Sequence, residues 1–125
     1  METVEGTVRA YFEALNRADV DDVVALFVED GTFMANEAPS VTGHKQIRQS
    51  FEGHFREISF RREVHIDEIR EGSEIATART HTTGTLTFLA ASNTVTIDSR
   101  ELFVLRKTDG DWRITDYMFN RPASS

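Results

Sequence analysis

The chain contains no cysteine, which removes several kinds of chemistry at once. Without cysteine there is no disulfide framework, no thiol nucleophile and no cysteine-ligated metal site. Disulfides belong to oxidising compartments, so their absence suits a reducing environment, and we expect the protein to be cytoplasmic.

Long apolar runs and a positive charge balance are missing too. No stretch approaches the roughly 20 apolar residues that a membrane-spanning helix needs. The N-terminal METVEGTVRAYF lacks the basic region and apolar run of a signal peptide. Against 14 lysines and arginines stand 21 aspartates and glutamates, a net charge of −7. An acidic chain is repelled by nucleic acid and by anionic membrane surfaces, so we expect neither as a partner.

The short motifs of several enzyme classes are also absent. There is no G-x-S-x-G elbow and no glycine-rich phosphate loop, so covalent acyl transfer and nucleotide binding have no support. The four histidines lack the H-x-x-x-H spacing of a helical metal site. His44, His54 and His65 are expected at solvated or helix-capping positions. We therefore predict no metal and no other cofactor.

What is present is a globular composition with helices first and strands later. The 125 residues suffice for one domain over 1–125. Helical periodicity predicts three helices: one over about 3–17, a second from an N-cap at Asp19 to Gly31, and a third after Gly43. A spacing of two then predicts strands over 60–69, 74–89, 94–107 and 112–120. This order indicates an α+β fold, with a curved antiparallel sheet around the helices.

The last two strands are joined by Asp109-Gly110, a pair typical of the tight type I′ turn. With that turn, paired residue numbers sum to 219, so Phe103 lies opposite Asp116. Side chains alternate across a strand, so one face mixes apolar and polar groups: Ser99, Glu101, Phe103, Leu105, Trp112, Ile114, Asp116, Met118 and Asn120. An unpaired carboxylate is costly to bury in a plain apolar core, so the mixture predicts a polar-lined pocket.

Three segments, in this order along the chain, resemble the nuclear-transport-factor-2-like superfamily: VRAYFEALNRADVDDVVALFVEDGTF, GHKQIRQSF and ELFVLRKTDGDWRITDYMFN. The likeness is greatest to its SnoaL-like branch of stand-alone polyketide cyclase and ketosteroid isomerase-like domains. The resemblance implies a cystatin-like cone, in which three N-terminal helices pack on a curved sheet and leave an internal pocket. It also implies a homodimer formed through the outer surface of the sheet. A shared fold does not select among the activities found in the superfamily.

The resemblance to the ketosteroid isomerases of that superfamily implies what stands at three functional positions. Their oxyanion-hole tyrosine falls on Tyr11, and their protonated oxyanion-hole aspartate falls on Glu101. Their general base falls on Ala35, which cannot take a proton. The resemblance therefore implies half of an oxyanion hole without the family's base.

Four residues are candidates for catalytic proton transfer: Tyr11, Glu101, Asp116 and His81. Two carboxylates in one apolar pocket cannot both ionise cheaply, so one of Glu101 and Asp116 would keep its proton and donate to a developing enolate. His81, which shares a strand face with Arg79, could replace the missing base. Structural roles stay open: the carboxylates as members of ion pairs, the strand face as an exposed one, and the Tyr11 ring as core.

The other candidates are ligand-binding residues. Arg79 could clamp an anionic or carbonyl group of a ligand. The remainder would line the pocket or belong to an ordinary core: Phe33, Phe51, Phe55, Phe103, Met118 and Asn120. The opposite face of the hairpin, with small residues of the long strand, predicts a dimer surface: Leu102, Val104, Tyr117, Phe119, Ala76 and Ala78.

Two functions fit these observations. In the first, the protein binds a small, largely apolar carbonyl compound and catalyses proton transfer next to the carbonyl, as an isomerase, cyclase or dehydratase does. In the second, it is a dimeric ligand-binding or accessory module that does no chemistry. The polar groups on an otherwise apolar face favour the enzyme, whereas Ala35 favours the binding module.

Overall fold

The computed structural model describes residues 1–122 and has α+β architecture. Its elements follow the chain in this order: α1 (Val4–Arg17), α2 (Val20–Ala25), β1 (Phe27–Met34), β2 (Val41–Thr42), α3 (His44–Glu57), β3 (Ile58–Glu71), β4 (Ile75–Phe88), β5 (Asn93–Thr96), β6 (Ser99–Thr108) and β7 (Asp111–Asn120). The strands are ordered β2-β1-β7-β6-β4-β3, with β5 paired to β4. All pairs are antiparallel except β1 with β7, so the sheet is mixed rather than wholly antiparallel.

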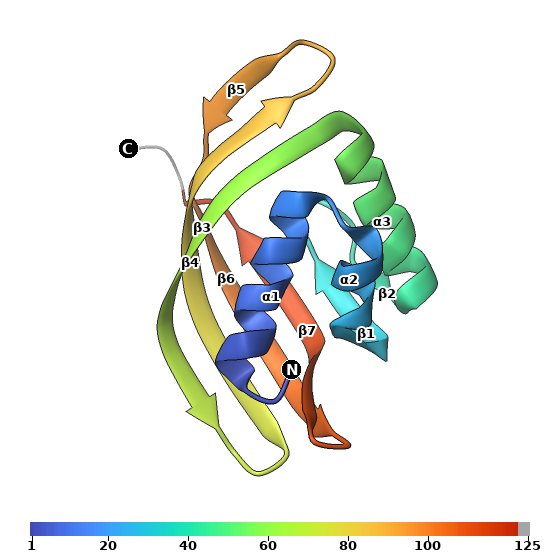
Figure 1. Ribbon diagram of the computed structural model, residues 1–125, viewed down its shortest axis with the longest axis vertical. Helices are drawn as coiled ribbons and strands as arrows, with labels where there is room; N and C mark the ends of the chain where they lie inside the picture. The colour runs from blue at the N-terminus through green and yellow to red at the C-terminus, as the bar shows by residue number, and fades with distance from the viewer. Residues whose placement is uncertain (123–125) are drawn as a thin grey trace.

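The sheet curves around α1, while α2 and α3 lie to one side of that helix (Figure 1). The apolar stripe of α1 faces the sheet and is buried, as its helical spacing predicts. Val8 and Phe12 belong to the same buried cluster as Phe103 and Trp112 of the last two strands. Within residues 1–122, no helix is long and apolar enough to cross a membrane.

Side-chain caps define where the first two helices begin. The Thr3 hydroxyl accepts a hydrogen bond from the Gly6 amide at 2.9 Å, and the predicted Asp19 cap accepts one from the Asp22 amide at 3.0 Å. The predicted end of the second helix at Gly31 is wrong, because α2 stops at Ala25. Beyond Ala25 the chain pairs with β7 instead, and the Leu26 carbonyl accepts a hydrogen bond from the Ile114 amide at 2.8 Å.

The turn between β6 and β7 has the predicted geometry, but its register changes partway along the strands. Asp109 and Gly110 have φ angles of 52° and 83°, as a type I′ turn requires. Pairs sum to 219 from the turn as far as Leu105 and Ile114, and to 220 beyond that point. Thr115 is the extra residue of a β-bulge, which reverses the alternation of side chains after it. The prediction that Phe103 lies opposite Asp116 is therefore wrong; its partner is Tyr117.

The bulge also corrects the predicted dimer surface. Tyr117 is 3% exposed, Ala76 1% and Ala78 0%, so these residues belong to the concave side of the sheet. Phe119 likewise packs against the core. On the convex side, Leu102 of the predicted surface pairs with Met118, and each is 41% exposed.

Gly84 allows β3 and β4 to approach closely beside Arg62, its partner in the register. Its φ is +138°, and a Cβ atom built there would lie only 2.0 Å from the Arg61 carbonyl oxygen. Only glycine tolerates both the conformation and the contact. Gly53, in the interior of α3, has ordinary helical φ and only one neighbouring atom within 4 Å, at 3.9 Å.

These two glycines provide a matched test of the fold. We expect Gly84→Ala to lower the free energy of unfolding by about 2–4 kcal/mol, because the methyl group forces the two strands apart. Gly53→Ala should raise it by about 0.5–1 kcal/mol, since alanine is the better helix former. Urea denaturation followed by circular dichroism measures both changes. Equal effects of the two substitutions would contradict the close approach of β3 and β4.

Candidate functional site

A cavity of about 310 Å³ lies between α1, α3 and the concave side of the sheet. Its volume is near the lower end of the range for small-molecule sites. Most of its wall is apolar, and the structure places two predicted liners, Phe33 and Phe51, in it. The wall also includes Phe12, Leu15, Ile58, Phe60, Leu86 and Phe119.

Glu101 lies at one end of this cavity and is only 3% exposed. Three hydroxyl groups donate hydrogen bonds to its carboxylate. The donors from Thr80 and Thr82 are each 2.7 Å from a carboxylate oxygen, and the Ser99 hydroxyl makes a third, short contact. The carboxylate thus accepts three hydrogen bonds, and two of the hydroxyl groups in turn accept from a cation.

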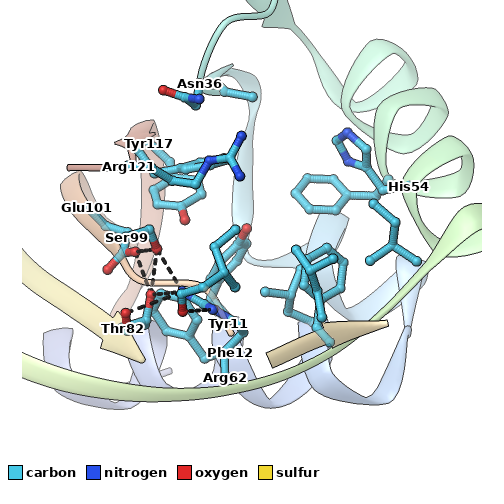
Figure 2. A pocket seen from close by; sticks show the side chains of 18 of the residues that line it. Tyr11, Phe12, Asn36, His54, Arg62, Thr82, Ser99, Glu101, Tyr117 and Arg121 are labelled. Atoms are coloured by element: carbon cyan, nitrogen blue, oxygen red, sulfur yellow. Dashed lines mark hydrogen bonds between the residues drawn. The ribbon is translucent and has the colours of Figure 1, made fainter. Parts of the chain in front are cut away.

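The Arg62 guanidinium lies behind those hydroxyls and supplies the compensating positive charge (Figure 2). Its Nη2 donates to the Thr82 hydroxyl at 2.9 Å and to the Ser99 hydroxyl at 3.1 Å. Its Nη1 donates to the carbonyl of Ile97. Burial lowers the pKa of Arg62, and the nearby Glu101 charge opposes that change. The buried charges of Arg62 and Glu101 are therefore joined through hydroxyl groups rather than in direct contact.

Asn16, in the last turn of α1, holds the backbone of Arg62 in place. Its side-chain amide donates to the Arg62 carbonyl at 2.9 Å and accepts from the Arg62 amide at 2.8 Å. This pair of bonds imitates the pairing of a neighbouring strand, and it ties the helix that carries Tyr11 to the strand that carries Arg62.

Two tyrosines bring hydroxyl groups to the cavity from different elements. Tyr11 of α1 and Tyr117 of β7 are buried, with ring centroids 4.8 Å apart. Burial raises the pKa of Tyr11, the hydrogen bond with Tyr117 lowers it, and the Glu101 charge raises it further. Burial also raises the pKa of Tyr117, and its hydrogen bond with Tyr11 adds to that increase. Both hydroxyl groups are therefore protonated at neutral pH and able to donate a hydrogen bond.

His54 faces the same cavity from α3 (Figure 2). Burial lowers the pKa of its imidazole from the ordinary value of 6.5, with a smaller opposing effect of the Glu57 charge. The ring is therefore neutral at pH 7 and able to accept a proton. Its ring centroid is 5.9 Å from that of Phe51, which in turn is 6.2 Å from that of Tyr11.

Three predicted site residues of β7 lie elsewhere because of the bulge. Asp116 and Met118 do not line the cavity, and Met118 is exposed on the convex side. Asn120 accepts a hydrogen bond from Arg100 at 2.6 Å at an exposed position. The predicted pairing of Glu101 and Asp116 within one pocket is thus wrong.

Arg79 and His81 also point away from the cavity, because the concave side of β4 is formed by the residues that alternate with them, such as Thr80 and Thr82. The His81 ring is 2.9 Å from Asp67 and stacks on His65, with centroids 4.8 Å apart. Arg79 lies 3.8 Å from the same aspartate. The prediction that Arg79 and His81 belong to the site is therefore wrong, and the alternative of an exposed strand face holds.

The last two predicted liners, Phe55 and Phe103, lie in the core next to the cavity rather than in its wall. Conversely, sequence reasoning assigned no role in the site to Arg62 or Thr82, whereas Ser99 was predicted on the same pocket-facing side of the hairpin as Glu101. A signal for Arg62 exists in the segment FRREV, where period-two alternation places it between Phe60 and Val64 on one strand face. No local signal turns His54 toward the cavity, because that depends on how α3 lies against the sheet.

The curved sheet around a helix, with an internal aromatic cavity, defines a cystatin-like fold of the nuclear-transport-factor-2 type, and solved structures bear this out. A ketosteroid isomerase-like protein from Erwinia carotovora atroseptica is 28% identical, with a TM-score of 0.91 over 97% of this chain and 95% of that one. A protein provisionally named scytalone dehydratase from Novosphingobium aromaticivorans is 18% identical, with a TM-score of 0.80 over 96% and 82%. A cystatin-like domain of unknown function from Nostoc punctiforme is 22% identical, with a TM-score of 0.76 over 95% and 75%.

The family follows from a separate comparison. The family model of the SnoaL-like domain matches residues 8–117, and the chain belongs to that family. A search of the curated proteins found no match to the chain.

The charge network gives a test that does not depend on any ligand. We expect Arg62→Met to lower the free energy of unfolding by about 3 kcal/mol, because it leaves the Glu101 carboxylate buried without a countercharge. Adding Glu101→Gln should restore most of that loss, since the buried charge is then gone. Urea denaturation of the single and double variants measures both effects.

The matched control is Arg61→Met, at the neighbouring exposed position. It should change the free energy of unfolding by no more than about 0.5 kcal/mol. A double variant less stable than Arg62→Met would mean that the two charges do not compensate each other.

Proposed function

We propose that this protein binds a small, largely apolar carbonyl compound and catalyses proton transfer next to the carbonyl. One observation carries the proposal: a neutral tyrosine hydroxyl and a neutral histidine face the same aromatic cavity. A ligand carbonyl bound at the hydroxyl has its adjacent carbon inside an apolar space that the imidazole also reaches.

The roles follow from the protonation of each group. Tyr11 stays protonated at neutral pH, so it donates to the carbonyl oxygen and stabilises negative charge that develops there. His54 is neutral and removes the proton from the carbon next to the carbonyl. When the protonated His54 returns the proton to another carbon, the reaction is an isomerisation. When it gives the proton to a hydroxyl group that then leaves as water, the reaction is a dehydration.

Glu101 acts in this proposal through other residues. Its carboxylate accepts from Thr80, Thr82 and Ser99, so most of its acceptor sites are occupied by protein hydroxyl groups. Its negative charge raises the pKa of Tyr11 and helps to keep that hydroxyl protonated. Tyr11, with Tyr117 behind it, is therefore the donor to the carbonyl, and Glu101 is a positioning residue.

A binding module without chemistry is the second candidate, and Ala35 favours it. This residue lines the cavity at the position where the resemblance implies a general base. Among residues 1–122, the cavity wall offers His54 as a base besides the hydrogen-bonded Glu101 carboxylate, so the two candidates differ in what His54 does.

Deuterium exchange distinguishes the two candidates. In D₂O, with cyclic enones and aryl ketones as ligands, we expect the wild-type protein to exchange protons next to the carbonyl, as measured by NMR. Tyr11→Phe and His54→Gln should each slow the exchange by about 10²-fold or more while binding persists. Because His54 must be neutral to act as a base, the rate should decrease as the pH falls through its pKa, which lies below 6.5.

His81→Gln is the matched histidine control, because that ring lies on the convex side of the sheet, and it should leave the exchange rate unchanged. Binding of ketones without exchange at any pH would establish the binding module instead. A protein that neither binds nor exchanges any of the ketones would contradict both candidates.

We also infer that the chain forms a homodimer through the convex side of the sheet. The support is an exposed apolar pair at its centre, Leu102 with Met118, surrounded by charges of both signs such as Arg79, Arg100 and Asp67. Because a twofold interface brings the same surface of both copies together, charges of both signs on that surface can form ion pairs across it.

Sedimentation equilibrium tests this dimer. Leu102→Glu should yield monomers, because the new carboxylate would be buried against the second copy. Leu89→Glu, which is 46% exposed on the β4–β5 connection, should leave the dimer intact. A wild-type protein that sediments as a monomer at all concentrations would contradict the dimer.

A further inference from the structure

After its bulge, β7 presents a column of three side chains to the cavity. Tyr117, Phe119 and Arg121 alternate along the strand and just beyond it, and all three line the cavity. Their exposure increases in that order, from buried through partly buried to exposed. The column therefore runs from the inner end of the cavity to its outer end, with a hydroxyl at the start and a guanidinium at the finish.

Arg121 differs from the other charged groups of the cavity wall. Arg62 and Glu101 compensate each other through hydroxyl groups at the inner end. Within residues 1–122, Arg121 takes part in no ion pair and no side-chain hydrogen bond of the kind that holds Arg62. Figure 2 shows it extending from the Tyr117 side into the space that the labelled side chains surround.

The net charge of the protein strengthens the argument that the Arg121 position serves an anionic ligand. In a chain with a net charge of −7, the outer end of this cavity carries an arginine. A guanidinium is a rigid planar donor that matches the two oxygens of a carboxylate. Asn36, an amide donor, lines the cavity as well and appears in the same part of it in Figure 2.

From this geometry we infer that the ligand is a carbonyl-bearing acid, whose carboxylate binds Arg121 while its apolar body lies along Phe119. The inference rests on the proposed function, because it orients the same ligand whose carbonyl meets Tyr11. At about 3.3 Å per residue, the Cα atoms of Tyr117 and Arg121 are about 13 Å apart. The carbonyl and the carboxylate therefore stand at opposite ends of a compact ring system.

The test compares an acid with its uncharged amide. The probe 6-acetyl-2-naphthoate has a ketone and a carboxylate at opposite ends of two fused rings, and 6-acetyl-2-naphthamide has the same shape without the charge. By fluorescence titration in low salt, we expect the wild-type protein to bind the acid about tenfold more tightly than the amide. The preference should shrink as salt is added, because the outer end is exposed.

Arg121→Gln should weaken binding of the acid about tenfold and leave binding of the amide nearly unchanged. Arg113→Gln is the matched control: it removes the same charge from an exposed position of β7, outside the cavity, and should preserve the preference. An equal loss of acid binding in both variants would show a general effect of net charge and would overturn the inference.

Failure of this inference can be told from failure of the proposed function. If the wild-type protein binds the acid and the amide equally and exchanges the acetyl protons of both in D₂O, the ligand need not be an acid and the proposed function stands. If it binds neither probe and exchanges no ketone, the proposed function fails and the inference fails with it.

Discussion

The interaction on which the rest of the structure depends is the indirect pairing of two buried charges. Glu101 on β6 and Arg62 on β3 lie on either side of a layer of hydroxyl groups from β4 and the start of β6. Removing a charge from water is costly, and a charge without compensation would not stay buried at this depth. Because the hydroxyls donate to the carboxylate and accept from the guanidinium, every polar atom of the network has a partner, and three strands are held in one arrangement around it.

This network places a polar end in an otherwise aromatic cavity. Tyr11 is tied to it through its own helix, since Asn16 in the same helix bonds the backbone of Arg62. The negative charge of Glu101 and the burial of the ring act together to keep the tyrosine protonated. A donor that is fixed before a ligand arrives needs little reorganisation when charge develops on that ligand. The same feature would serve a binding module by orienting a carbonyl group.

The bulge at Thr115 decides which residues of the last strand meet the cavity. Before it, the concave side receives Trp112 and Ile114; after it, the side receives Tyr117 and Phe119. One extra residue thus exchanges an aspartate and a methionine for a tyrosine and a phenylalanine in the wall. It also leaves Met118 beside Leu102 on the convex side, which gives that surface its exposed apolar centre.

Local patterns in the sequence determined the elements and much of the cavity's character. The Asp19 cap, the apolar spacing of the first helix and the Asp109-Gly110 turn depend on neighbours within a few residues, and the structure has them where they were predicted. The position of Glu101 among apolar residues likewise follows from alternation close to that turn.

Tertiary structure alone decided the rest. A bulge such as that at Thr115 resets the alternation without a local signal, so Asp116 was predicted on the wrong side. The alternation of side chains predicts which residues of β4 share a face, but not which face is concave. The prediction therefore put His81 in the site instead of Thr82. The roles of His54 and Arg62 arise from packing between distant segments, and burial, which alters their pKa values, exists only once those segments meet.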